Sequence, residues 1–146
     1  TDLKAIEKSM MRFEKATLAQ SGVERSEANQ EFHFAISRAA GNRYFQTFYD
    51  QVLMDTIRLA RACFSDQLLS RAVPDASLSA HLQETIRQHR LMFEAIEQLN
   101  AEWADELAVL HHHLTTERLK KVLFSNMSDG ETTPHLNIDP GLWRLS

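Results

Sequence analysis

The chain has 146 residues, of which 43% are hydrophobic and 25% are charged, and its formal net charge is −4. These proportions are typical of one ordinary globular domain, and the acidic balance excludes strong DNA binding by this segment alone. No apolar run approaches the roughly 18–20 residues that a membrane-spanning helix needs. Cys63 is the single cysteine, so an internal disulfide is excluded and a cytoplasmic location is expected.

Apolar residues recur at helical spacing in five segments of the chain. The predicted helices cover about Asp2–Gln20, Glu24–Ala40, Arg43–Ser70, Ser79–Leu99 and Ala101–Phe124. The chain has only 4 Gly and 3 Pro, and most of them lie between or beyond these segments, which favours long helices over many short strands. We therefore predict an all-α fold, an antiparallel helical bundle with short connections.

Glycines and polar residues mark the expected helix ends. Gly22 is expected to lie just past the first helix, and Gly41 to end the second. Asn42 is placed to cap the third helix. After Asn126 the chain becomes rich in Ser, Asp, Gly, Thr and Pro, so we expect a helical domain at residues 1–127 and an extended tail at 128–146.

The third predicted helix is the longest and is apolar on more than one side. Phe45, Phe48 and Val52 mark one face, while Leu53 and Ile57 widen it. A helix that is apolar over a broad arc is usually central in a bundle. The pattern therefore predicts that this helix lies in the middle of the fold.

Three of the seven histidines fall on stripes that face the interior. Asn29 and His33 are four residues apart and share one helix face, while His89 and His111 occupy core positions on two other helices. Imidazole nitrogen and carboxamide oxygen are plausible ligands for zinc, nickel or a similar divalent ion. The same pattern also fits hydrogen-bonded core histidines, and periodicity alone leaves both interpretations open.

The segment from Asn29 to Asn42, NQEFHFAISRAAGN, resembles a signature of the FCD effector-binding domain. That domain follows a winged helix-turn-helix in the FadR branch of GntR-family transcription regulators. A second match runs from Gln88 through Ile96, and a third is the position of His111, 22 residues after His89. The resemblance covers roughly Asp2 to Phe124.

The resemblance implies a bundle of six or seven helices that binds a small effector, often a carboxylic acid, above a divalent metal. At the matching positions the metal ligands would be Asn29, His33, His89 and His111, with zinc or nickel as the expected ion. Asn29 stands where the family usually has Asp, so the protein would not neutralise the ion and an anionic effector is favoured as the remaining ligand.

The resemblance further implies a homodimer. It also implies that operator DNA is bound only through an N-terminal winged-helix domain, which this chain lacks. A helix that usually precedes the segment starting at Asp2 is lacking as well. Arg58 and Arg61 on the long third helix are candidates for gripping the effector carboxylate, because Arg can do so through two hydrogen bonds. The alternative is that both carry solvated or subunit-facing charges.

The sequence leaves two alternatives to a ligand-sensing regulatory domain. A metal-dependent hydrolase is disfavoured because Gln30, Ile86 and Ala108 stand three residues before the inward histidines, so no Glu-x-x-His motif is present. The expectation is therefore that the chain is not an enzyme. The remaining alternative is a structural helical module that binds no small molecule.

Overall fold

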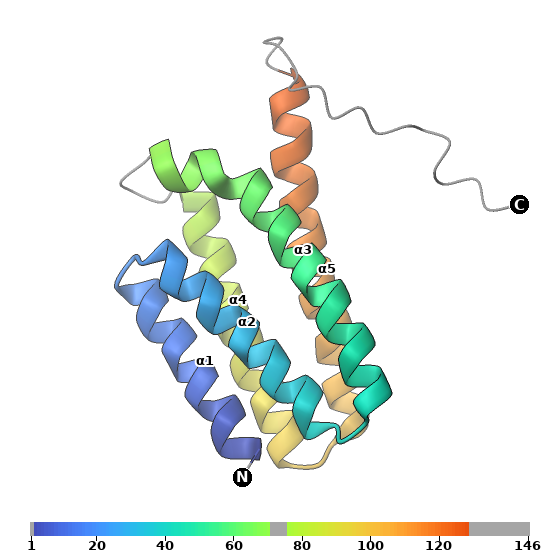
Figure 1. The fold of residues 1–146 in the computed structure, drawn as a ribbon. Coiled ribbons are helices and arrows are strands. Elements are labelled where there is room, and N and C mark those ends of the chain that lie inside the picture. The colour runs from blue at the N-terminus through green and yellow to red at the C-terminus, as the bar shows by residue number, and fades with distance from the viewer. Residues whose placement is uncertain (1, 71–75, 129–146) are drawn as a thin grey trace, which may run out of the picture.

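The computed structural model describes residues 2–70 and 76–128, and all of the regular structure in these ranges is helical. The helices are α1 (Asp2–Leu18), α2 (Gly22–Ala39), α3 (Arg43–Ser70), α4 (Ala76–Glu97) and α5 (Ala101–Ser128). Successive helices run in opposite directions along the bundle (Figure 1). The predicted all-α bundle is thus confirmed. The first residue of the predicted tail at 128–146, Ser128, is the last residue of α5, and the rest of the predicted tail lies outside the described residues.

The turn between α2 and α3 forms as its residues predict. Gly41 has a φ of +66°, the left-handed conformation that glycine adopts without a steric penalty. The side-chain oxygen of Asn42 accepts hydrogen bonds from the backbone N–H groups of Tyr44 and Phe45, both at 3.1 Å. Asn42 therefore caps α3, and this prediction is confirmed.

The end of α1 differs from the prediction. The left-handed residue is Gln20, with a φ of 57°, whereas Gly22 is the first residue of α2. The backbone N–H of Ser21 donates to the carbonyl of Ala16 at 3.0 Å, which closes the helix end. Leu99, also with a φ of 57°, takes the same position after α4. A hydrogen-bonded helix end can hold a non-glycine residue in this conformation, so the position of Gly22 was a misleading signal.

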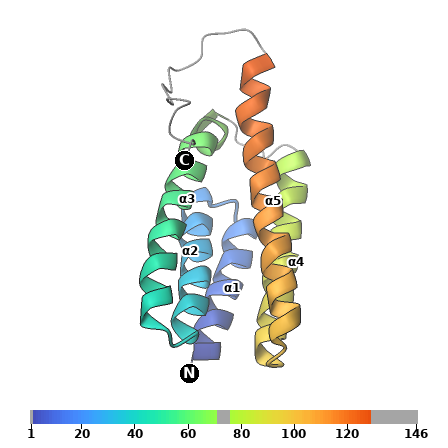
Figure 2. The same cartoon turned by 90° about the vertical axis from the view of Figure 1, so that its right-hand side faces the viewer.

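The core is formed mainly by α1, α2 and α4. Ile6, Phe32 and Ala95 are fully buried and come from these three helices in turn. α1 packs along α2 and α4, while α5 packs along α4 and adds Leu107 to the core (Figure 2). This body holds the interior positions of α2, α4 and α5 close together.

α3 lies at the side of the bundle, and the prediction that it is central is wrong. In the described part of the chain it packs against α2 and α5, and less extensively than any other helix packs against its neighbours. Ile57 on its inner face is buried, but Tyr44 is 90% exposed and Phe48 is 72% exposed. Hydrophobicity around a helix indicates how much apolar surface it carries, and not how many neighbours cover that surface. No helix in the described ranges, α3 included, is both long and apolar enough to cross a membrane.

Candidate metal and ligand site

Three buried imidazoles from three helices meet in the interior. They belong to His33 on α2, His89 on α4 and His111 on α5. Their ring centroids are 5.6 Å apart for His33 and His89, 5.2 Å for His33 and His111, and 4.8 Å for His89 and His111. One ring nitrogen from each residue can be chosen so that all three lie within 4.8 Å of one another. We call this group the imidazole cluster.

His89 is the most enclosed member of the imidazole cluster. Its ring is fully buried, stacked on Phe32 at a centroid distance of 4.2 Å and tilted against Phe13 at 4.9 Å. Neither ring nitrogen has a hydrogen-bond partner among the described residues. A buried polar atom without a partner costs about 1–3 kcal/mol. A metal ion would use the free lone pair of this ring, so the residue fits a ligand role.

His111 is oriented by a chain of hydrogen bonds that sequence reasoning missed. The side-chain amide N–H of Gln88 donates to the carboxylate of Glu84 at 2.9 Å, so the amide oxygen of Gln88 faces Nδ1 of His111, at 3.0 Å. That oxygen can only accept a hydrogen bond, so Nδ1 carries the proton and Nε2 keeps a lone pair. Arg87 in turn donates to Glu84, and together with Gln88 it lowers the pKa of that carboxyl group.

Hydrogen bonding to the outer nitrogen of a metal-ligating histidine is a common supporting arrangement. The signal in the sequence is the four-residue spacing of Glu84 and Gln88, directly before His89. This spacing lets the two side chains bond on one helix face. Such pairs are common on exposed helices, and the sequence alone does not distinguish this one from them.

The environment keeps the three imidazoles neutral at pH 7. Burial, with a smaller effect from His111, lowers the pKa of His33 to about 3. Burial, followed by the nearby His81 and His112, lowers the pKa of His111 to about 4. Burial and the other two imidazoles lower the pKa of His89 well below 6.5. Neutral imidazole is the form that binds zinc or nickel, so the donor set fits such an ion.

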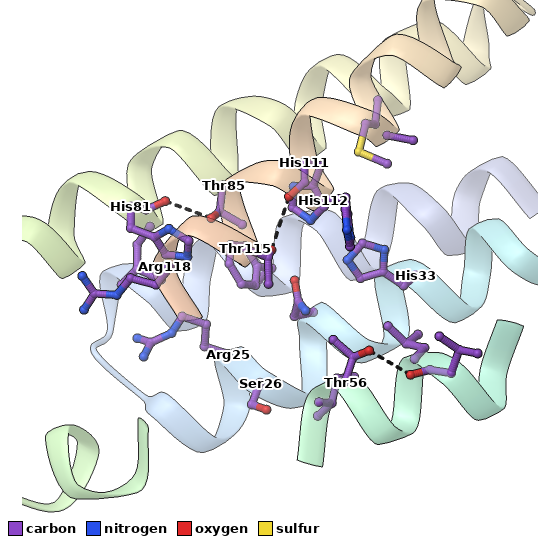
Figure 3. Close-up of a pocket in the computed structure, with 18 of the residues that line it drawn as sticks. Arg25, Ser26, His33, Thr56, His81, Thr85, His111, His112, Thr115 and Arg118 are labelled. Carbon is purple, nitrogen blue, oxygen red and sulfur yellow. Dashed lines mark hydrogen bonds between the residues drawn. The ribbon is translucent and has the colours of Figure 1, made fainter. Parts of the chain in front are cut away.

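A cavity of about 460 Å³ adjoins the imidazole cluster. His33 and His111 line it (Figure 3), whereas the fully buried His89 does not. Asn29, half-buried and one turn before His33 on α2, also lines it. Much of the remaining wall is apolar and comes from α1, α3 and α4, through Phe13, Val52, Leu53, Ile57, Leu78, Leu82 and Met92. The structure thus places Asn29, His33 and His111 on the wall of a ligand-sized space, with His89 next to the two histidines.

Arg58, one of the two arginines predicted to grip an effector, does not line this cavity. Arg58 is exposed and donates a hydrogen bond to Asp55 on its own helix, at 3.1 Å. The next residue along a helix points about 100° away, and Ile57 takes the inward direction, so Arg58 faces outward. The geometry therefore gives Arg58 no support as an effector ligand, and the side chain of Arg61 lies outside the described residues.

Comparison with known proteins gave one match. A family model described as the FCD domain matches residues 1–115. The matched segment contains all three residues of the imidazole cluster and ends four residues after His111. Searches of curated proteins and of solved structures found no match.

Proposed function

The chain belongs to the FCD family of regulatory effector-binding domains, and on this basis we propose that it binds a small carboxylate beside a divalent metal ion. The observation that carries the proposal is the imidazole cluster, in which three neutral, buried rings meet beside a cavity of about 460 Å³. A regulatory domain with these features has a place for an ion and, next to it, a place for a small molecule.

Each residue has a separate role in the proposed site. His33, His89 and His111 each offer one imidazole lone pair, and Asn29 offers an amide oxygen at the cavity wall. None of these groups carries a negative charge, so the double charge of the ion would remain uncompensated by them. A divalent ion there would supply a positively charged Lewis-acid site, which favours a carboxylate as the next ligand.

Regulation would follow from the position of the cavity between helices. Its wall includes Val52, Leu53 and Ile57 of α3, the helix that packs least extensively against its neighbours in the described fold. A ligand that contacts this wall in one arrangement of α3 better than in another shifts the population toward the first. In a homodimer whose N-terminal domains bind operator DNA, such a shift would change the spacing of the two DNA-binding heads.

A hydrolytic function finds no support in the site. FCD domains are regulatory rather than catalytic units. No Asp or Glu is found among the described residues that line the cavity. A carboxylate general base is therefore missing from this part of the wall, in agreement with the lack of a Glu-x-x-His motif.

The proposal is tested by metal content. Plasma mass spectrometry on untagged protein purified without chelator should give about one zinc or nickel ion per chain. The double variant His33→Ala/His89→Ala should lose the ion, whereas His113→Ala, at an exposed neighbouring position, should keep it. Equal metal content in the wild type and the double variant would refute the site.

Asn29 provides a second and finer test of the proposal. Asn29→Asp adds a carboxylate ligand, so it should tighten metal binding and weaken the binding of an anionic effector such as acetate or butyrate. Calorimetric titrations of metal, and then of the acid, measure both changes. Unchanged affinities for both would contradict the proposed role of the uncompensated charge.

A further inference from the structure

The end of the cavity remote from the imidazole cluster is basic. Arg25, His81 and Arg118 gather there from α2, α4 and α5, while His33 and His111 lie at the other end (Figure 3). Burial, and then the charges of Arg118 and Arg25, lower the pKa of His81 to about 4, as expected when cationic groups crowd together. We call these three residues the basic cluster.

The same arrangement repeats on all three helices. Each helix has a residue of the imidazole cluster, then a small polar residue, then a residue of the basic cluster, at spacings of three or four residues. On α2 the three residues are His33, Asn29 and Arg25. On α4 they are His89, Thr85 and His81. On α5 they are His111, Thr115 and Arg118. Seven or eight residues separate the ends of each stripe, which is roughly 10–12 Å along a helix axis. The cavity therefore has two chemically different ends separated by a polar middle.

Arg25 lacks an anionic partner among the described residues. It is half-buried, and burial alone lowers the pKa of its guanidinium. By contrast, Arg12, Arg87 and Arg90 each pair with glutamates at the surface. A partly desolvated cation is costly unless an anion is close, and no described Asp or Glu lines this cavity. The charge of Arg25 is thus available to a ligand.

Two further features support an anion at this end. Arg118 is buried and its Nη1 donates to the hydroxyl of Ser77 at 2.8 Å, which fixes the position of its side chain. Gly22, the first residue of α2, lines the same end, and Ser21 makes no side-chain capping bond to the N–H groups that begin this helix. The positive end of the α2 dipole thus adds to the charges of Arg25 and Arg118, while His81, with its lowered pKa, is neutral at pH 7.

We infer that the effector is a small dicarboxylate, held by one carboxylate at the imidazole cluster and by the other at Arg25. For the imidazole end, this inference rests on the proposed function. In the middle, the hydroxyls of Thr85 and Thr115 donate to the carbonyls of His81 and His111, at 2.9 and 3.3 Å. Their oxygen lone pairs remain free to accept a hydrogen bond from a hydroxyl group on the ligand.

The test compares acids with one and two carboxylates on the same protein. Calorimetry on the zinc-loaded chain would use succinate, glutarate and adipate, each beside the monocarboxylate of equal chain length, butyrate, valerate and hexanoate. At least one diacid should bind about tenfold or more tightly than its monoacid. A hydrogen-bonded charge pair between ligand and protein increases the binding affinity by about this factor.

Variants at position 25 test whether Arg25 binds the second carboxylate of the diacid. Arg25→Gln should remove the advantage of the diacid while leaving the monoacid affinity and the zinc content unchanged. Arg25→Lys should retain part of the advantage, since it keeps the charge but loses the paired hydrogen bonds. Arg58→Gln is the matched control, because Arg58 is an exposed arginine outside the cavity, and it should change neither affinity. Circular dichroism verifies that each variant is folded.

The possible failures are distinguishable. Zinc-dependent binding of monoacids, with no advantage for any diacid or an advantage that survives Arg25→Gln, would overturn this inference and leave the proposed function intact. A chain that takes up zinc at the imidazole cluster but binds no acid of either class would overturn this inference and the carboxylate part of the proposed function. Absence of both zinc and acid binding would overturn both proposals.

Discussion

Apolar residues recur at helical spacing both in the interior around His89 and on the outer face of α3, but those in the interior are buried and those on the outer face of α3 are exposed. Phe32 is fully buried and stacks on His89, whereas Phe48 is 72% exposed. The interior position is surrounded by α1, α2 and α4, while α3 contacts its neighbours through one face. Burial is thus decided by the number of helices that surround a position, and substitutions in the two regions should have very different effects.

The largest difference is expected between two phenylalanines. Phe32→Ala removes a fully buried ring and should lower the free energy of unfolding by about 3–5 kcal/mol. Phe48→Ala removes an exposed ring and should change it by less than about 1 kcal/mol. Urea denaturation of both variants measures the contrast. Similar losses would mean that the outer face of α3 is covered in solution.

Acid should act on the interior through the imidazole cluster. Without metal, the pKa of His33 is about 3 and that of His111 about 4 in the folded chain, against 6.5 in an unfolded one. The unfolded chain therefore binds protons first as the pH falls below 6.5, so stability is complete above that pH and declines toward about pH 4. Between pH 6.5 and 5 the loss is roughly 2 kcal/mol for each of these residues.

Denaturation of the chelator-treated chain at pH 7.5, 6 and 5 measures this loss. The variant His33→Leu should show a shallower dependence on pH than the wild type, because one of the titrating groups is gone. The exposed variant His113→Ala should retain the dependence of the wild type. A stability that does not change over this range would contradict the burial of the imidazoles.

His89→Leu should separate the stability of the interior from its function. The substitution replaces a buried ring, whose two nitrogens have no hydrogen-bond partner in the described part of the chain, with an apolar side chain of similar size. We expect the metal-free chain to gain about 1–3 kcal/mol of unfolding free energy, because two unsatisfied polar atoms are removed. The same variant should lose the metal binding proposed above. A loss of stability would show that water or another group satisfies His89 in solution.

The smallest effect is expected at the exposed pair on α3. Arg58 and Asp55 are both largely exposed, so Arg58→Gln should change the free energy of unfolding by less than about 0.5 kcal/mol. Thermal unfolding of the variant beside the wild type gives the value. A larger change would indicate that Arg58 contacts something beyond Asp55.

The sequence predicted the parts of this fold that depend on local chemistry. The five helices follow from the apolar period, and the turn at Gly41 and Asn42 follows from their backbone and capping preferences. The inward positions of His33, His89 and His111 follow from the same period, since each occurs where a core residue is due.

Features that depend on how the helices are arranged in space could not be predicted from the sequence. The period of α3 identified its apolar faces but gave no information on how many helices cover them. At positions 25 and 118, the sequence pattern does not distinguish an arginine exposed to solvent from an arginine that lines a cavity. Arg58 was predicted to bind the effector because it lies on the long third helix, but Ile57 beside it takes the inward direction.

The stripe of Arg25, Asn29 and His33 on α2 has a consequence for how ligand length can be altered. Side chains return to one face of a helix about once per turn, so a basic residue can move along this stripe only in steps of roughly 5.4 Å. For the diacid inferred above, selectivity for ligand length would therefore be graded in helical turns. Thr85 lies in the equivalent middle position on α4 and is not one of the proposed metal ligands, so a basic residue at position 85 would create a site for an acid shorter by about one such step.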